Sequence, residues 1–286
     1  MAWVPTTAAE HGQQLSDTDY RFLRDLIHAR SGISLGDHKQ RLVQGRLQRR
    51  LRQLGLASFA DYCERVRENP EPEMDALLSA VSTNVTRFFR EPHHFDYLAR
   101  ELLPRCLQAS GRIRIWSAGC ATGEEAYTLA MILEQAVREH GRPADALILA
   151  TDLSVEALDV ARAGIYRADQ LVDIPSEFRS RWFMRGTGAH EGEVRVRPEL
   201  HEWIRFQALN LLDEWPMQGR FDAIFCRNVV IYFDREGKRR LFSRFSHQLA
   251  AQGYVFLGHS ESMAGLSDDF DLIGRTIYRR RPDASA

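Results

Sequence analysis

Short, almost wholly apolar segments that alternate with helical segments constrain the fold of this chain more than any other feature. Apolar side chains occupy both faces of three expected strands, at residues 146–151 (ALILAT), 221–226 (FDAIFC) and 254–258 (YVFLG). Helices are expected at residues 154–163 and 235–250. Strands that are apolar on both faces need cover on both, which is typical of a parallel sheet between layers of helices. The sequence therefore predicts an α/β fold.

A helical region precedes this α/β part. Apolar residues recur at helical spacing and predict helices at residues 17–31, 37–54, 58–68 and 76–81, with a break at the Asn69-Pro70-Glu71-Pro72 run. We therefore expect a flexible tail at 1–14, a helical domain at 15–82, a linker at 83–95 and the α/β domain at 96–286.

One stretch, at about residues 165–205, interrupts the alternation. Valine alternates with arginine at residues 194–197, and turns are supplied by glycines at Gly186, Gly188 and Gly192. This pattern predicts a small antiparallel β-subdomain inserted into the α/β domain.

Composition excludes several classes of protein. The formal net charge of −1 over 286 residues argues against broad binding to nucleic acid. The four cysteines form no CxxC pair, and no metal site is expected. No apolar run approaches the roughly 20 residues that span a bilayer, and the first residues do not resemble a signal peptide. A cytoplasmic monomer without membrane insertion is expected.

The segment SAGCATGEE at residues 117–125 follows an expected strand at 112–118 and opens a helix at 124–139. Such a strand, glycine loop and helix begin a doubly wound nucleotide-binding fold, although the loop could also be a tight turn with no ligand. Neither a P-loop nor a GxGxxG fingerprint is present. Glu124 and Glu125 would repel phosphate at the helix N-terminus, so they favour a cationic ligand such as S-adenosylmethionine.

Polar residues follow the other expected strands. Asp152 ends the second strand, where a carboxylate can accept both ribose hydroxyls of an adenosine or, alternatively, cap the next helix. Residues 207–213 could bind an adenine ring or form an ordinary loop. Arg227 and Asn228 stand at the carboxyl end of the third strand, where ligands bind in such sheets. The Asn/Asp-Pro-Pro-aromatic turn typical of nucleobase methyltransferases is missing there.

The second expected helix carries a basic face. Residues 38–54 contain no Asp or Glu, and one arc of the helical wheel holds Lys39, Arg46, Arg49 and Arg50. This face is either solvated or a docking surface for an acidic partner.

Together these motifs resemble the chemotaxis receptor methyltransferases, the CheR family. The resemblance spans about residues 15–280 and rests on TNVTRFFREPHHF (83–95), IWSAGCATGEEAYTLA (115–130), TDLS (151–154), WFMRGTGAHEGEVRV (182–196), FQALNLL (206–212), FDAIFCRNVVIYFD (221–234) and FLGHSES (256–262). It implies an all-α N-terminal domain before an S-adenosylmethionine-dependent methyltransferase domain of Rossmann-like fold, with an inserted antiparallel subdomain.

The resemblance also implies a site. It implies that the cofactor is held by Asn84, Thr86, Arg90, Glu125, Asp152, Asn210, Leu211, Arg227 and Asn228. Residues 82–90 would otherwise look like a plain linker. In family members with a glycine-rich loop in the inserted subdomain, that loop grips a peptide at the C-terminus of the receptor, and Gly186, Gly188 and Gly192 resemble it.

The expected reaction is the transfer of a methyl group from S-adenosylmethionine to a glutamate carboxylate of a methyl-accepting chemotaxis receptor, leaving S-adenosylhomocysteine. Glutamate is already ionised near neutrality, so no general base is needed. Tyr232 is expected to orient the acceptor carboxylate, and Arg90 to pair with the carboxylate of the cofactor; these two are the catalytic candidates. The alternatives are a nicotinamide oxidoreductase, a cofactor-binding sensor without catalysis, and a nucleic-acid methyltransferase.

Overall fold

The computed structural model describes residues 14–82 and 84–282, which form two compact units. One unit contains the helices up to residue 82 together with Tyr232–Asp234. The other contains residues 84–231 and 235–282. Of the expected tail, residues 1–13 lie outside the described residues, as does residue 83 of the expected linker.

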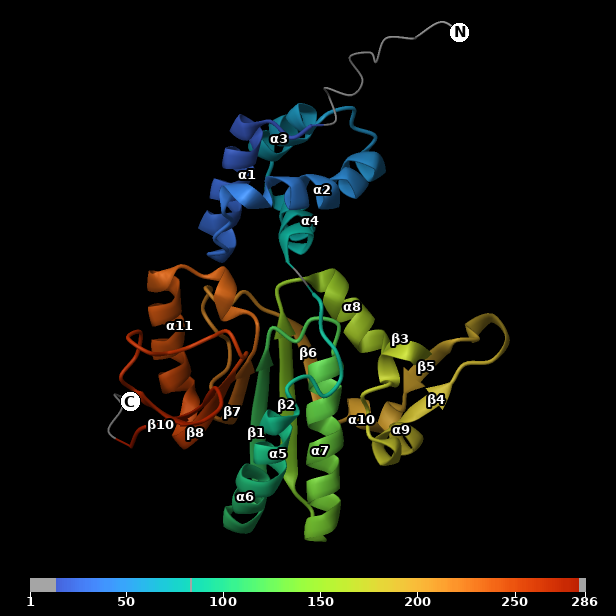
Figure 1. Ribbon diagram of the computed structural model, residues 1–286, viewed down its shortest axis with the longest axis vertical. Helices are drawn as coiled ribbons and strands as arrows, with labels where there is room; N and C mark the ends of the chain where they lie inside the picture. Colours follow the sequence, from blue (N-terminus) through green and yellow to red (C-terminus); the bar gives the residue numbers. More distant parts are fainter. Residues whose placement is uncertain (1–13, 83, 283–286) are drawn as a thin grey trace, which may run out of the picture. The chain divides into compact units, whose positions relative to one another are not determined.

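The helical unit is built from α1 (Asp17–Ser31), the 3-10 turn η2 (Asp37–Lys39), α2 (Gln40–Leu54), α3 (Phe59–Glu68) and α4 (Glu71–Val81), in blue to teal in Figure 1. Local sequence sets the helix ends: Ser16 accepts a hydrogen bond from the Asp19 amide, and Gly32 ends α1 in the left-handed conformation. The expected helices are confirmed. However, Pro72 lies in the first turn of α4 rather than in a break, because a proline there has no helical hydrogen bond to lose.

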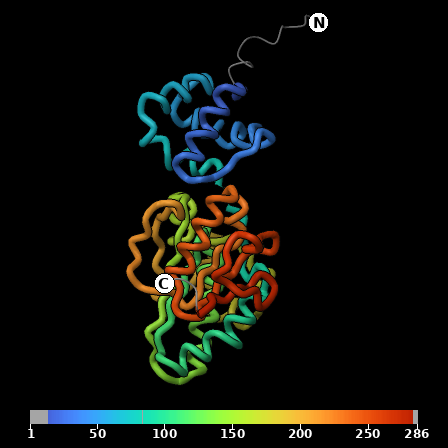
Figure 2. Tube along the Cα trace, turned by 90° about the vertical axis from the view of Figure 1, so that its left-hand side faces the viewer, coloured from blue at the N-terminus to red at the C-terminus, as the bar shows by residue number. Residues whose placement is uncertain are grey.

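The second unit contains a seven-stranded sheet in the order β6-β2-β1-β7-β8-β10-β9. The strands are β1 (Arg112–Ala118), β2 (Asp145–Asp152), β6 (Ile204–Ala208), β7 (Phe221–Cys226), β8 (Leu249–Leu257), β9 (Phe270–Gly274) and β10 (Ile277–Arg280). The first five in this order are parallel, but β10 runs antiparallel to β8 and β9. The expectation of a parallel sheet is therefore wrong at this edge, where a tight turn joins β9 to β10 and so reverses the chain. Figure 2 turns this orange-to-red edge toward the viewer.

Helices cover both faces of the sheet, as expected. Ile115 on β1 belongs to the core that includes residues of α7 (Glu124–His140), whereas its neighbour Trp116 packs edge-on against Phe245 of α11 (Arg235–Gln248) at 5.7 Å between ring centroids. Other helical segments are α5 (Pro92–Tyr97), the π-helical η3 (Leu98–Leu102), α6 (Leu103–Ala109), α8 (Val155–Ala163) and α10 (Pro198–His201). The expected linker thus already enters α5 at Pro92. Among the described residues, no helix is long and apolar enough to cross a membrane.

The inserted subdomain is a three-stranded antiparallel sheet in the order β3-β5-β4. Its strands are β3 (Ile165–Arg167), β4 (Phe183–Arg185) and β5 (Glu193–Val196), shown in yellow in Figure 1. This confirms the antiparallel insertion. It also contains α9 (Ser176–Trp182) and the 3-10 turns η4 (Ala168–Leu171) and η5 (Gly188–His190), which the sequence pattern did not reveal.

Candidate cofactor site

The loop between β1 and α7 is shaped by its glycines. Gly119 and Gly123 have φ angles of 96° and 98°, a region that favours residues without a Cβ. The amides of Gly119 and Cys120 both donate to the Thr151 carbonyl, at 2.8 and 2.9 Å. These two bonds tie the glycine loop to the carboxyl end of β2, so the ends of the two strands form one edge.

Glu125, in the first turn of α7, forms a buried ion pair with Arg227 at the end of β7. The Glu125 Oε2 to Arg227 Nη1 distance is 3.0 Å, and the Ser117 hydroxyl donates to Glu125 Oε1 at 2.6 Å. Only 3% of the Arg227 side chain is exposed. Burial raises the pKa of Glu125 above its ordinary value, while the Arg227 charge opposes that rise.

Arg227 also contacts the segment that leads into α5. Its Nη2 lies 3.3 Å from Glu91 Oε2 and donates to the Arg90 carbonyl. Glu91 Oε1 in turn lies 2.9 Å from His259 Nδ1. Burial acts to raise the pKa of Glu91, but the His259 hydrogen bond and the Arg227 charge outweigh it and hold the pKa below its ordinary value. One guanidinium therefore lies between two carboxylates.

Asp152, at the end of β2, is fixed by backbone amides. The Ala121 amide donates to Oδ2 at 2.8 Å and the Ser154 amide donates to Oδ1 at 2.9 Å. Ser154 itself caps α8. Each carboxylate oxygen of Asp152 can accept a second hydrogen bond, so the side chain can still take two ribose hydroxyls. Burial raises its pKa, although the amide bonds oppose this.

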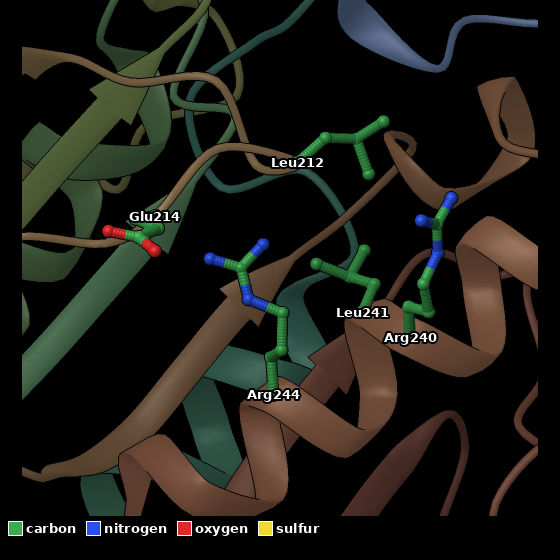
Figure 3. A pocket seen from close by; sticks show the side chains of 5 residues that line it. All are labelled: Leu212, Glu214, Arg240, Leu241 and Arg244. Atoms are coloured by element: carbon green, nitrogen blue, oxygen red, sulfur yellow. The ribbon is translucent and has the colours of Figure 1, made fainter.

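The loop after β6 is held by Arg244 of α11. The Arg244 guanidinium lies 3.9 Å from the centroid of the Trp215 ring and donates to the Leu211 carbonyl at 2.8 Å and to the Asp213 carbonyl. Asn210 Oδ1 accepts from the Leu212 amide at 3.0 Å. A hollow of about 220 Å³ lies beside this loop (Figure 3), and its lining residues are Leu212, Glu214, Arg240, Leu241 and Arg244.

Strained backbone marks these same loops. Six non-glycine residues in the described ranges have a positive φ, and four of them lie in the loops just described: Phe89, Glu91, Ala121 and Asn228. Such conformations cost free energy and concentrate at functional sites, where the surrounding structure enforces them. Two of the four flank Arg90.

The sequence did not single out Glu91 or Glu261 as site residues. Glu261 follows β8 and accepts hydrogen bonds from the amides of Asn228 and Ile231, at 2.8 and 3.1 Å. Both glutamates occur within the quoted motifs FFREPHHF and FLGHSES, which is the signal that could have found them.

The predicted residues are brought together to different degrees. Arg227 contacts both Glu125 and the backbone carbonyl of Arg90. The amide of Leu209, which precedes Asn210, donates to the Asp152 carbonyl at 3.0 Å. The Arg90 side chain turns back to the Val85 carbonyl at 3.2 Å, and both Asn84 and Thr86 lie half-buried in the same segment. Tyr232 groups with the helical unit, where its carbonyl accepts from the Ser34 amide at 2.7 Å.

The expected docking residues also differ from one another. Lys39 and Arg49 are exposed, whereas Arg50 pairs with the buried Glu73 at 2.8 Å and Arg46 donates to the carbonyls of Ala80 and Ser82. Half of the predicted basic face therefore also holds α2 against α4. In the inserted subdomain the left-handed conformation occurs at Gly188 and Gly192, and an added Cβ at Gly186 would overlap His190.

The side chains at this edge fit an adenosyl cation. Three buried carboxylates, on Glu124, Glu125 and Asp152, have pKa values raised by burial, and one buried guanidinium partly balances them. A positively charged ligand would stabilise their ionised forms, whereas a phosphate would be repelled. No group of three or more potential metal-ligating side chains occurs in the described ranges.

In this doubly wound sheet, acidic side chains lie at the strand ends, where a nucleotide-binding protein would place its phosphate-binding loop. This arrangement is typical of S-adenosylmethionine-binding methyltransferases. Two family models confirm this class: "CheR methyltransferase, all-alpha domain" matches residues 18–82 and "CheR methyltransferase, SAM binding domain" matches residues 84–279. The chain belongs to the CheR methyltransferase family.

Similar proteins span nearly the whole chain. The chemotaxis protein methyltransferase of Escherichia coli K12 is 44% identical over 94% of this chain and 93% of its own length. Chemotaxis protein methyltransferase 2 of Pseudomonas aeruginosa is 41% identical over 91% of this chain and 92% of its own length. Among solved structures, magnesium protoporphyrin IX methyltransferase from Synechocystis with bound SAM shows a TM-score of 0.35 at 15% identity, covering 66% of this chain and 76% of that one.

Proposed function

We propose that this chemotaxis methyltransferase transfers a methyl group from S-adenosylmethionine to glutamate side chains of chemotaxis receptors and so forms glutamate methyl esters. The observation that carries the donor half of the proposal is the buried acidic edge formed by Glu125 and Asp152. The names of the relatives, chemotaxis protein methyltransferases, support the acceptor half.

Each predicted residue has a role in this proposal. Asp152 accepts the ribose hydroxyls, Asn210 and Leu211 border the adenine, and Glu125 attracts the positively charged methionine end of the donor. Arg90, together with Asn84 and Thr86 from the same segment, binds the carboxylate of the donor. Arg227 and Asn228 complete the pocket, although Arg227 acts mainly by fixing Glu125 and Glu91, because both carboxylates neutralise its charge.

The chemistry needs alignment more than proton transfer. When bound, the donor supplies a sulfonium methyl group that an oxygen nucleophile can displace. A glutamate carboxylate is ionised near neutrality, with an ordinary pKa of about 4.3, so the protein need not remove a proton. Alignment can lower the barrier by about 7–11 kcal/mol. Tyr232 is proposed to orient the acceptor carboxylate through its hydroxyl.

The acceptor is proposed to dock through charge and through backbone pairing. The exposed Lys39 and Arg49 on the basic face would attract the acidic methylation helices of a receptor. The loop that contains Gly188 and Gly192 next to β5 would grip a C-terminal receptor peptide. Neither surface includes a residue assigned to donor binding, so changes in either surface are proposed to alter acceptor affinity rather than donor affinity.

The decisive experiment uses S-adenosylmethionine with a labelled methyl group and a receptor fragment that carries the methylation helices. Transfer to a carboxylate gives an ester that releases labelled methanol in mild base, whereas methyl groups on nitrogen remain attached. Base-labile label that requires the receptor supports the proposal. Label that resists base, or label that appears without the receptor, refutes the carboxylate acceptor.

A further inference from the structure

Glu261 is a buried carboxylate whose hydrogen-bond partners are backbone amides. It lies just after β8, and 5% of the residue is exposed. Its Oε2 accepts from the Gly258 amide at 2.6 Å and from the Asn228 amide at 2.8 Å, while its Oε1 accepts from the Ile231 amide at 3.1 Å. One side chain thus joins the loop after β7 to the end of β8.

Two of the three amides that donate to Glu261, those of Asn228 and Ile231, come from a strained loop. Asn228 has a φ of 61°, a left-handed conformation that is unfavourable for a residue with a Cβ. The loop also lies close against β8, because an added Cβ at Gly258 would come within 2.6 Å of Asn228 Nδ2. A carboxylate that binds both the amide of Asn228 itself and that of Ile231 holds this conformation in place.

This loop connects directly to the donor-binding groups. Arg227, which pairs with Glu125, immediately precedes Asn228. Val229, which follows Asn228 in the chain, packs closely on Gly119: a Cβ added to Gly119 would overlap the Val229 side chain. A shift of the loop would therefore move both the Glu125–Arg227 pair and the glycine loop after β1.

We propose that Glu261 is a positioning residue of the methyltransferase: it fixes the loop 227–231 so that Arg227, Asn228 and the glycine loop present one preformed donor pocket. Its carboxylate acts through the backbone and does not touch the donor. This inference rests on the proposed function, because it assigns these loops to donor binding.

The test compares Glu261→Gln with Asp222→Asn in the full-length protein. An amide side chain cannot accept at both ends, so one of its N–H groups would face a loop amide. Asp222 is the matched control, because its carboxylate also accepts a backbone amide, that of Arg114 at 2.8 Å, but at the opposite end of β7. Calorimetry measures the affinity for S-adenosylhomocysteine, thermal unfolding measures stability, and initial rates give the KM for each substrate.

We expect Glu261→Gln to weaken S-adenosylhomocysteine binding about tenfold and to raise the donor KM by a similar factor, with the acceptor KM unchanged. Asp222→Asn should leave donor affinity unchanged, because the asparagine oxygen can still accept from the Arg114 amide. Equal donor affinity in wild type and Glu261→Gln overturns the inference and leaves the proposed function intact. A wild type that gives no heat with S-adenosylhomocysteine overturns the proposed function. If Glu261→Gln does not fold, Glu261→Asp, which keeps the charge but shortens its reach, must still weaken donor binding, and unchanged binding overturns the inference.

Discussion

Replacing Arg227 by methionine tests the buried charge network most directly. In the wild type, carboxylate oxygens of Glu125 and Glu91 lie 3.0 and 3.3 Å from the Arg227 guanidinium. Methionine keeps much of the length of the arginine side chain but removes the positive charge between the two carboxylates. Two unit charges 3.0 Å apart attract by about 5 kcal/mol at an effective dielectric constant of about 20. Desolvation of the pair offsets part of this attraction, and removing one partner of a buried pair typically costs about 3–5 kcal/mol.

The lower end of that range applies here. Glu91 keeps its bond to His259 and Glu125 keeps its bond to Ser117, so each carboxylate retains one partner in the variant. We therefore expect a loss of about 3 kcal/mol, which lowers the urea midpoint by about 1 M or more. Intrinsic fluorescence follows the sheet unit, since all the tryptophans of the described residues lie in it: Trp116, Trp182, Trp203 and Trp215.

The loss should depend on pH in a defined direction. Without the cation, the folded-state pKa of Glu125, which is already above its ordinary value, rises further, and the pKa of Glu91 rises because the Arg227 charge no longer helps to hold it down. A carboxyl with a raised pKa destabilises the folded protein above that pKa, and the lost stability returns as the pH falls and the carboxyl binds a proton. Each unit of pH recovers at most about 1.4 kcal/mol per group in that window, so the difference from wild type should be smaller at pH 5.5 than at pH 7.5.

The control for this prediction is Arg114→Met on the same sheet. Arg114 pairs with Asp145 at 2.6 Å, but 67% of the aspartate side chain is exposed, so loss of this ion pair should cost little stability. Asp145 is exposed and an ordinary aspartate has a pKa of about 3.9, so its carboxylate is ionised at both pH values even without the Arg114 hydrogen bond. An Arg227→Met penalty as small as that of the control, or one equal at both pH values, would refute the reasoning.

Three other outcomes are expected. Arg244→Ala should cost about 1–2 kcal/mol through the lost Trp215 contact and Leu211 hydrogen bond, and it should weaken S-adenosylhomocysteine binding severalfold, measured by thermal shift with and without ligand. Tyr232→Phe should slow methylation with donor affinity unchanged; a full rate would remove the tyrosine from the mechanism. Gly119→Ala should abolish donor binding in calorimetry, because the new Cβ overlaps Val229 and the φ of 96° is strained.

Local patterns were sufficient to predict much of the fold. The strands β1 and β7 begin and end at the predicted residues, because each is an apolar run bounded by polar or glycine residues. The strand β6 was not predicted, because only Ile204 among its five residues is buried, so β6 lacks the apolar run that marks the inner strands. The pair β9 and β10 was missed for a similar reason: β9 is largely exposed, and the reversal depends on a tight turn at Thr276.

The sequence predicts less of the candidate site than of the fold. Residue type and position at a strand end were enough to suggest that Asp152, Arg227 and Asn228 lie at one edge, because parallel strands bring their carboxyl ends together. The partners of these residues depend on chain segments far away in the sequence, and no periodicity encodes them. Glu91 reaches Arg227 across 136 positions of sequence, and Glu261 reaches Asn228 across 33. A glutamate that binds only backbone amides leaves no complementary charge in the sequence to reveal it. The proposed donor-binding residues at the strand ends can therefore be suggested from their own segments, whereas the residues that hold them in place become visible only once the loops are folded against one another.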